Sequence, residues 1–173
     1  MGTSCVVGVG AIGGLLAARL AESGEQVTGI ARGATLAAIR RNGLRLDAAG
    51  RTVRQTIEAT DCPTTAGVHD IVWITLKAHQ LTAVASSLSC LLGPATTVVT
   101  LCNGLPWWYF HQCPPPNDRA SDIVDPGGAI SAALDPARAI GCVVYPAARM
   151  VAPGRVAHVF GQRFSVGEPD GSN

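Results

Sequence analysis

The sequence predicts an α/β protein of three layers, αβα, in which helices cover both faces of a doubly wound and mostly parallel β-sheet. Short apolar runs alternate with helical patterns along the chain, as parallel strands and their crossover helices do. A glycine turn, Gly8-x-Gly10-x-x-Gly13, separates the first strand pattern from the first helical pattern. Glycine is frequent, at 20 residues, and aromatic residues make up only 5%. This composition favours close packing of helices on a sheet over an aromatic-rich β-sandwich.

The first thirty residues predict one βαβ unit. Ser4–Val9 is an apolar run typical of a buried strand, and Gln26–Ala31 predicts the next strand. Between them, residues 15–23 predict a helix that ends at Gly24, because glycine adopts the left-handed conformation of a helix C-terminal cap. The helix is indicated by apolar residues spaced i, i+3, i+4 and i+8: Ile12, Leu15, Leu16 and Leu20. Since a crossover helix joins the two strands, we expect them to pair in parallel.

A short helix and two short strands are predicted after the second strand. Thr35–Arg41 predicts a short helix that ends at Asn42-Gly43. Leu44–Leu46 and Thr52–Ile57 predict two short strands, which flank a turn at Asp47–Gly50.

A second strand–helix–strand unit is predicted further along the chain. Ile71–Leu76 is an apolar strand pattern, and Gln80–Leu92 carries leucine and valine at helical spacing. Gly93-Pro94 ends this helix, because proline cannot continue it. Thr96–Cys102 predicts the next strand.

The last third of the chain is predicted to hold a long connection and an antiparallel edge. Residues 111–138 are rich in proline and glycine and predict a loop with one short helix near 128–134. Ile140–Tyr145 is another apolar strand pattern. Val156–Phe160 and Arg163–Val166 then flank Gly161-Gln162, and a two-residue loop with glycine first predicts a type II′ hairpin. We therefore expect an antiparallel hairpin at one edge of the sheet.

One domain is expected over residues 1–168. The remaining residues, 169–173, are turn-rich and resemble the start of a linker to a further domain.

Hydrophobic residues make up 47% and charged residues 14%, which excludes intrinsic disorder. The net charge of +1 argues against a nucleic-acid partner. No run is long enough for a membrane helix, and glycines interrupt the apolar stretch 5–21, which also has no preceding basic residue, so neither a membrane partner nor a signal peptide is predicted.

The cysteines predict a reducing compartment. Six are present, none in a C-x-x-C pair, and no histidine lies at zinc-ligand spacing from a pair, so no metal site is predicted. We expect all six thiols to be reduced and the protein to be cytoplasmic.

The glycine turn predicts a dinucleotide-binding site of the Rossmann type. Its three glycines permit a tight turn, a close approach of the backbone to a pyrophosphate, and close packing of the helix on the strand. The following helix offers free N–H groups and a positive dipole end to phosphates. NAD sites place an acid after the second strand, whereas this chain has Arg32. Arg32 can bind a 2′-phosphate through paired hydrogen bonds, so NADP(H) is preferred over NAD. Arg40 and Arg41 either add to this positive field or form a solvated helix face.

Two polar residues follow apolar strands directly: Lys77 and Asn103. The carboxyl ends of parallel strands share one edge of the sheet, so both should lie near the glycine turn. Lys77 is the single lysine among 13 basic residues, which favours a specific role over that of an ordinary surface lysine. The alternative for Asn103 is a plain turn with Gly104. His79 and His111 have no evident partner and are expected to be structural. The aromatic run 107–110 is expected to pack in the core or at a domain interface rather than to line a substrate pocket.

Five motifs in order resemble the ketopantoate reductase (2-dehydropantoate 2-reductase) family: GVGAIGG, AR-G, TLKAHQ, CNGLPWW and GCVVYPAA…APGRVAHV…GEPDG. The resemblance covers residues 3–171. Members reduce 2-dehydropantoate, a 2-oxoacid, to pantoate with NADPH in pantothenate biosynthesis. The resemblance implies that Arg32 binds the 2′-phosphate, that Lys77 and Gln80 lie along the cofactor, and that Ala148 touches the cofactor through its backbone. It places Asn103, the one catalytic candidate, near the nicotinamide ribose and the substrate. The pyrophosphate loop that it implies is Gly8, Val9, Gly10, Ala11, Ile12 and Gly13.

The chain also departs from this family. Members carry a second, helical domain that supplies a lysine as proton donor, whereas this sequence has no lysine after Lys77. We therefore expect the cofactor half of an oxidoreductase site, with the alternative of a stand-alone nucleotide-binding or regulatory module. A severed domain interface would leave apolar surface exposed, so a homodimer is an expected form.

Overall fold

The fold is built on a seven-stranded sheet, sheet A, in the order β11-β8-β7-β6-β1-β2-β5. The computed structural model describes residues 2–113 and 118–169. The strands of sheet A are β1 (Thr3–Val7), β2 (Gln26–Ile30), β5 (Glu58–Thr60), β6 (His69–Ile74), β7 (Leu92–Leu101), β8 (Ala139–Val144) and β11 (Phe164–Gly167). All neighbours pair in parallel except β11, which pairs with β8 in the antiparallel direction. The predicted α/β class, the mostly parallel sheet and the antiparallel edge are confirmed.

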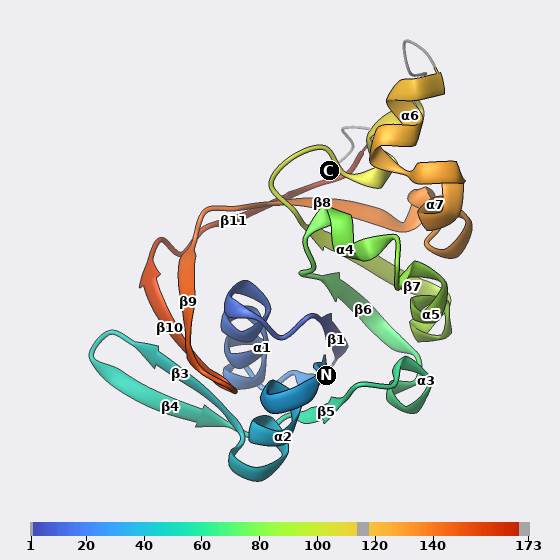
Figure 1. The fold of residues 1–173 in the computed structure, drawn as a ribbon. Coiled ribbons are helices and arrows are strands. Elements are labelled where there is room, and N and C mark those ends of the chain that lie inside the picture. The colour runs from blue at the N-terminus through green and yellow to red at the C-terminus, as the bar shows by residue number, and fades with distance from the viewer. Residues whose placement is uncertain (1, 114–117, 170–173) are drawn as a thin grey trace.

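A second, four-stranded sheet, sheet B, lies over the α1 side of sheet A (Figure 1). Its order is β4-β3-β10-β9, and only β3 and β10 pair in parallel. Its strands are β3 (Leu44–Ala48), β4 (Arg51–Gln55), β9 (Ala147–Ala152) and β10 (Arg155–Phe160). Helix α1 (Ala11–Glu22) contacts strands of both sheets, so that sheet B adds a layer to the predicted three. Buried side chains of the two sheets and of α1 and α2 form one apolar cluster there, around Val6, Leu15 and Val156.

The remaining helices are short. They are α2 (Gly33–Asn42), α3 (Pro63–Ala66), α4 (Ala78–Leu81), α5 (Ala85–Leu88), α6 (Asp118–Val124) and α7 (Ala129–Ala133), with 3₁₀ turns at Ser89–Leu91, Trp107–Phe110, Pro126–Gly128 and Pro136–Arg138. Helix α1 ends as predicted: Gly24 has φ +93°, its N–H donates to the Ala21 carbonyl, and the Glu25 N–H donates to the Leu20 carbonyl. This pair of bonds is the Schellman motif, which satisfies the last carbonyls of the helix.

The predicted pairing of 156–160 with 163–166 is wrong. Strand β10 pairs with β9 and β3 in sheet B, whereas β11 pairs with β8 in sheet A. The hairpin turn lies instead at Pro153-Gly154, where Gly154 has φ +69°, a left-handed value that glycine adopts without steric cost. Gly161 is the point where the chain crosses between the sheets, and a Cβ there would lie 3.0 Å from the Tyr145 carbonyl oxygen. The glycine therefore serves a close crossing of two segments rather than a hairpin.

The predicted helix over 80–92 is broken into α4, α5 and a 3₁₀ turn. Serine hydroxyls in this stretch bond back to the backbone: Ser87 Oγ donates to the Val84 carbonyl and Ser89 Oγ to the Ser86 carbonyl. Such local bonds compete with a continuous helix. Strand β7 begins at Leu92 and includes Gly93-Pro94, which were expected to end the helix. The expected helix near 128–134 is present as α7, and α6, β5, β9 and α3 are additional elements.

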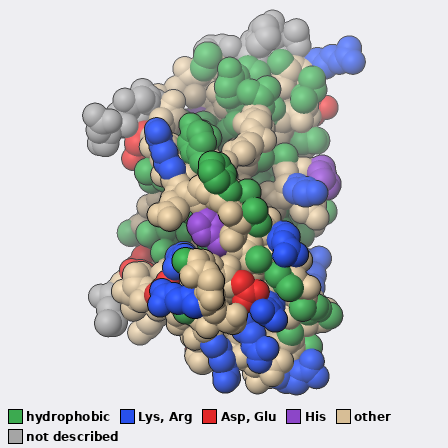
Figure 2. Space-filling view, turned by 90° about the vertical axis from the view of Figure 1, so that its left-hand side faces the viewer, with side chains coloured by type: hydrophobic (Ala, Val, Ile, Leu, Met, Phe, Trp, Pro, Cys, Tyr) green, Lys and Arg blue, Asp and Glu red, His purple; other side chains and the backbone are tan. Residues whose placement is uncertain are grey.

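The outer face of sheet B is basic. Arg54, Arg45 and Arg155 are register neighbours on β4, β3 and β10. Arg155 binds Asp47 through Nε at 2.8 Å and Nη2 at 3.1 Å, and these bonds lower the pKa of the Asp47 carboxyl. Figure 2 shows basic side chains gathered on the lower part of this side of the molecule, where β3 and β4 lie in Figure 1. A near-neutral sequence thus still folds with a basic face.

Candidate dinucleotide site

A cleft of about 850 Å³ opens at the carboxyl ends of the central strands of sheet A. The chain runs outward from β1 to β2 and β5 on one side and from β6 to β7 and β8 on the other. The point between β1 and β6 is therefore the topological switch point, where α/β sheets bind ligands. The cleft is lined by Val7, Gly8, Val9, Gly10, Ala11, Ile12, Gly13, Ile30, Ala31, Arg32, Thr35, Pro63, Thr75, Leu76, Lys77, Ala78, Gln80, Ala83, Val84, Ser87, Leu88, Leu101, Cys102 and Asn103.

The glycine turn forms the floor of this cleft in a conformation that its glycines permit. Gly8 has φ +98°, its N–H donates to the Ile30 carbonyl at 3.0 Å, and the Gly10 N–H donates to the Gly8 carbonyl at 2.7 Å. A Cβ at Gly13 would collide with the Gly8 carbonyl oxygen and with the Thr75 hydroxyl. At Gly10, in contrast, the nearest atom to a Cβ is 3.9 Å away. Gly13 is thus required for packing, whereas Gly10 keeps the space above the turn open.

Helix α1 presents an uncapped N-terminus to the cleft. Its N-cap residue, Gly10, has no side chain that could cap the helix, and the first turn of the helix contains no acidic residue. The positive end of the helix dipole and the first backbone N–H groups are therefore available to an anion. Ala11, Ile12 and Gly13 of this first turn line the cleft. These features fit a dinucleotide pyrophosphate.

Thr75 is a component of the site that the sequence analysis missed. It follows β6, lines the cleft and lies directly beside Gly13. Its hydroxyl lies 2.9 Å from the Val7 carbonyl oxygen and 2.7 Å from the Gly8 carbonyl oxygen. The only sequence signal for this role is a threonine at the carboxyl end of an apolar strand.

Arg32 stands at the end of β2 as the N-cap residue of α2 and lines the cleft. Its guanidinium is exposed and has no hydrogen-bond or ion-pair partner within residues 2–113 and 118–169. No Asp or Glu is among the residues that line the cleft. Arg40 instead donates from Nε to the Ala59 carbonyl at 3.0 Å and ties α2 to β5, and neither Arg40 nor Arg41 lines the cleft. Of the predicted arginines, the structure brings only Arg32 to the site.

Lys77 and Gln80 lie together at the start of α4. The Lys77 N–H donates to Gln80 Oε1 at 3.1 Å, and the Gln80 N–H donates to the Lys77 carbonyl at 2.8 Å. The Gln80 side chain is thus held by the helix start, while the Lys77 ammonium is exposed at the cleft with no partner in the described part of the chain. Lys77 supplies the second cation of a cleft that has no lining carboxylate.

Asn103 lies at the other end of the cleft, after β7. Its Nδ2 donates to the Val144 carbonyl at 3.1 Å, and the Val144 N–H donates to its Oδ1 at 3.1 Å. The neighbouring Cys102 is half-buried, and burial raises the pKa of its thiol. All six cysteines are free thiols in the structure.

Ala148 is not brought to this cleft. It lies in β9, opposite His158 of β10, and packs against the apolar cluster between the sheets. His79 is exposed at α4 and does not line the cleft either. The assignment of Ala148 to the cofactor therefore has no support from the cleft geometry, unlike the other predicted residues.

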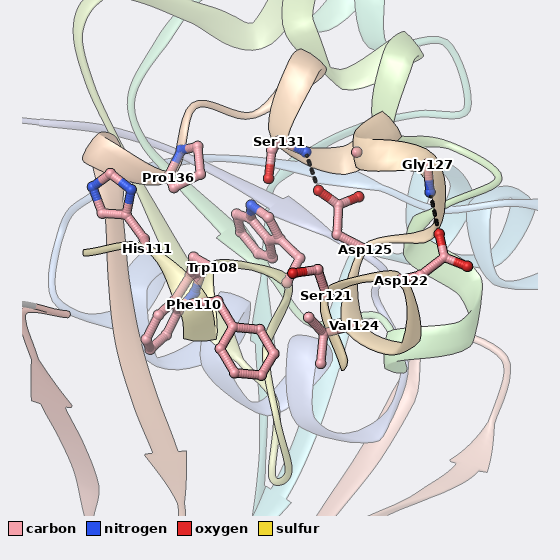
Figure 3. A pocket seen from close by; sticks show the side chains of 12 residues that line it. Trp108, Phe110, His111, Ser121, Asp122, Val124, Asp125, Gly127, Ser131 and Pro136 are labelled. Carbon is pink, nitrogen blue, oxygen red and sulfur yellow. Dashed lines mark hydrogen bonds between the residues drawn. The ribbon is translucent and has the colours of Figure 1, made fainter. Parts of the chain in front are cut away.

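A second, smaller cavity of about 350 Å³ lies in the β7–β8 connection, beside the aromatic run (Figure 3). Its walls include Trp107, Trp108 and His111. The indole N–H of Trp107 donates to the Leu134 carbonyl and that of Trp108 to the Thr100 hydroxyl. Asp125 accepts N–H bonds from Ile130 and Ser131 at the start of α7. These polar groups hold the connection together, and Trp107 is buried in the core, as expected of packing.

The fold and the cleft define a Rossmann-like domain with a dinucleotide-type glycine turn at its switch point. A sequence model of ketopantoate reductase PanE/ApbA matches residues 4–107, and the chain belongs to this family. A 2-dehydropantoate 2-reductase of Mesorhizobium japonicum is 48% identical over 168 residues, which cover 96% of this chain and 52% of that protein.

Solved structures agree with this assignment. A ketopantoate reductase from Ralstonia solanacearum is 41% identical with a TM-score of 0.91, over 98% of this chain and 53% of that one. A 2-dehydropantoate 2-reductase from Geobacter metallireducens is 26% identical with a TM-score of 0.76, over 96% and 49%. The chain thus spans about half the length of these relatives. Among the described residues, no helix combines the length and apolar character needed to cross a bilayer.

Proposed function

We propose that this chain is the NADPH-binding domain of an oxidoreductase that reduces a 2-oxoacid, with 2-dehydropantoate as the substrate. One observation carries the cofactor assignment. The cleft that holds the glycine turn is lined by two cations, Arg32 and Lys77, and by no Asp or Glu. A carboxylate after β2 would bind a ribose 2′-hydroxyl and repel a 2′-phosphate, whereas a free guanidinium favours the phosphate.

Different residues of the cleft would bind different parts of NADPH. The N–H groups at the start of α1 would hold the pyrophosphate, and Arg32 would hold the 2′-phosphate. Lys77 would add a mobile positive charge, since an ammonium on a flexible stem adapts to a phosphate or ribose oxygen. Asn103, fixed to β8 at the far end of the cleft, would orient the nicotinamide ribose and the keto acid.

When bound, NADPH supplies the hydride for reduction of the keto carbon. The chain contributes orientation to this step, which is a large component of catalysis. Protonation of the forming alkoxide requires a general acid. The Asn103 amide can donate a hydrogen bond but cannot deliver a proton at neutral pH. Within this proposal, the proton donor and the substrate-binding groups other than Asn103 come from the half that the longer relatives carry beyond the matched region.

A stand-alone nucleotide-binding module is the second candidate. It is favoured by the absence of His, Asp and Glu from the described residues that line the cleft. Such a module would bind NADPH and need no general acid. The two candidates differ in what happens when the second half of a relative is supplied.

Calorimetric titration of the 173-residue chain tests the cofactor assignment. We expect NADPH to bind more tightly than NADH, and equal affinities would contradict the proposal. A chimera then tests catalysis: residues 1–168 are joined to the second half of the Mesorhizobium japonicum relative. NADPH oxidation that depends on 2-dehydropantoate is expected of a reductase domain. A folded chimera that binds NADPH without turnover would support the module.

A further inference from the structure

Thr75 links two structural units that meet at the cleft. Its backbone N–H donates to the Val7 carbonyl at 3.0 Å, which continues the β1–β6 pairing. Its hydroxyl reaches one step further, to the Gly8 carbonyl oxygen at 2.7 Å. The same carbonyl accepts the Gly10 N–H. Gly8, the first residue of the turn, is thus held by the side chain of Thr75, the residue that follows β6.

The position of the hydroxyl is also fixed by packing. A Cβ built on Gly13 would overlap Thr75 Oγ, so the hydroxyl lies directly against the first turn of α1. A Cβ on Gly8 would lie 3.3 Å from the same oxygen. Thr75 Oγ therefore occupies the space between the two ends of the glycine turn. The hydroxyl therefore contacts both the start of the turn and the first turn of α1.

We propose that Thr75 is a positioning residue that sets the direction of the phosphate-binding N–H groups at the start of α1. This inference rests on the proposed function. The hydroxyl is already bonded to backbone carbonyls, so Thr75 acts through the turn rather than by contact with a ligand. Its effect should be confined to ligands that place a pyrophosphate on the turn. The affinity of a ligand that is bound by Arg32 alone should not change when Thr75 is replaced.

Two probes separate these contributions. NADPH carries both the pyrophosphate and the 2′-phosphate, whereas adenosine 2′-monophosphate carries only the 2′-phosphate. Thr75→Val keeps the shape of the side chain and removes the hydroxyl. We expect it to weaken NADPH about tenfold, the scale of a lost hydrogen bond, and to leave the affinity for adenosine 2′-monophosphate within about twofold. Thr75→Ser, which keeps the hydroxyl, should restore NADPH binding.

Thr96 provides a matched control. Its buried hydroxyl also donates to a backbone carbonyl, that of His69 at 2.7 Å, but near the start of β7 and outside the cleft. Thr96→Val should lower the melting temperature without changing either affinity. A purely structural role for Thr75 would give the same result as Thr96→Val. If Thr75→Val does not fold, Thr75→Cys replaces it, because a thiol is a weaker donor than a hydroxyl.

Each outcome of these titrations either supports or overturns the role of Thr75. Selective loss of NADPH affinity with rescue by serine supports the inference. Unchanged NADPH affinity in a folded Thr75→Val protein overturns it, and so does an equal loss for both probes or a failure of serine to rescue. Wild-type protein that binds adenosine 2′-monophosphate but not NADPH would overturn the inference and the proposed function together.

Discussion

Asn103 and Val144 exchange two hydrogen bonds of 3.1 Å, although they lie 41 residues apart in the sequence. Strands β7 and β8 pair through Leu101 and Cys142, and the Asn103 amide extends this contact beyond the end of the main-chain ladder. The side chain is thus fixed before any ligand arrives. Its second amide hydrogen and the second lone pair of its oxygen remain for a ligand. Asn103 is therefore both a structural tie and a preformed element of the cleft.

Replacement of Asn103 by aspartate should destabilise this tie. The carboxylate still accepts the Val144 N–H, but its second oxygen faces the Val144 carbonyl without a proton between them. We expect Asn103→Asp to lower the free energy of unfolding by about 0.5–1.5 kcal/mol, the net contribution of a typical hydrogen bond, because the pair is exposed to water. Asn103→Ala, which opens the site to water, should cost less. Urea unfolding curves measure both, and an Asp variant as stable as the wild type would contradict the role of the tie.

Arg32 should determine the choice between NADPH and NADH. Arg32→Asp places a carboxylate after β2, where it would repel a 2′-phosphate and accept the ribose hydroxyl. The preference for NADPH should disappear or reverse. Arg41→Asp is the matched control, because Arg41 carries the same charge on α2 but does not line the cleft. Equal effects of the two substitutions in titrations would mean that only the general positive field matters.

Lys77 should contribute to affinity and little to stability. Its ammonium is exposed and has no partner in residues 2–113 and 118–169, so its loss leaves no protein group unpaired. Lys77→Ala should weaken NADPH by about 1–3 kcal/mol, the range for a hydrogen bond to a charged group. The melting temperature without cofactor should barely change. An unchanged dissociation constant would assign Lys77 to the ordinary surface.

Two glycines of the turn should fail in different ways when changed to alanine. At Gly13 the new methyl group would strike the Gly8 carbonyl and the Thr75 hydroxyl, so Gly13→Ala should lower the melting temperature. At Gly10 the nearest atom is 3.9 Å away and φ is −91°, a value that alanine adopts. Gly10→Ala should therefore fold normally and lose NADPH affinity, since its methyl group would stand where the pyrophosphate approaches. Thermal melts and titrations of both variants check this contrast, which fails if Gly10→Ala binds NADPH as the wild type does.

The sequence was sufficient for the features that depend on local chemistry. The glycine turn, Arg32 after β2, and Lys77 and Asn103 after their strands all reach one cleft, because parallel strands bring their carboxyl ends to one edge. The motif spacing carries this information without any knowledge of distant contacts.

Other features depend on contacts that no local pattern encodes. Gly161-Gln162 has the composition of a hairpin turn, yet the chain there crosses from sheet B to sheet A, because β10 finds partners in β9 and β3. The partner of Asn103 is a backbone group of β8, and that of Thr75 is a carbonyl of the glycine turn. Both pairs are set by how distant strands align. The assignment of Ala148 rests on the resemblance alone, and the structure places this residue in β9, outside the lining of the cleft.

The final prediction concerns catalysis by the 173-residue chain itself. Reduction of 2-dehydropantoate requires a hydride donor, an oriented keto acid and a proton source. The hydride donor, NADPH, would be bound by the glycine turn, Arg32 and Lys77. Asn103 would provide part of the orientation of the keto acid. Orientation and general acid catalysis each lower the barrier by several kcal/mol. Without the half that the longer relatives carry, both contributions are largely missing, so the chain should bind NADPH and turn over no measurable 2-dehydropantoate.

The absorbance of NADPH at saturating 2-dehydropantoate measures this rate directly. The full-length Mesorhizobium japonicum relative, assayed in parallel, serves as the comparison for the conditions. A rate of about 1 per second or more from the short chain would lie in the usual enzyme range. The proton donor would then have to be a group of this chain. Lys77, whose ammonium faces the same cleft, would be the first to replace, and loss of turnover in a Lys77→Ala protein that still binds NADPH would identify it.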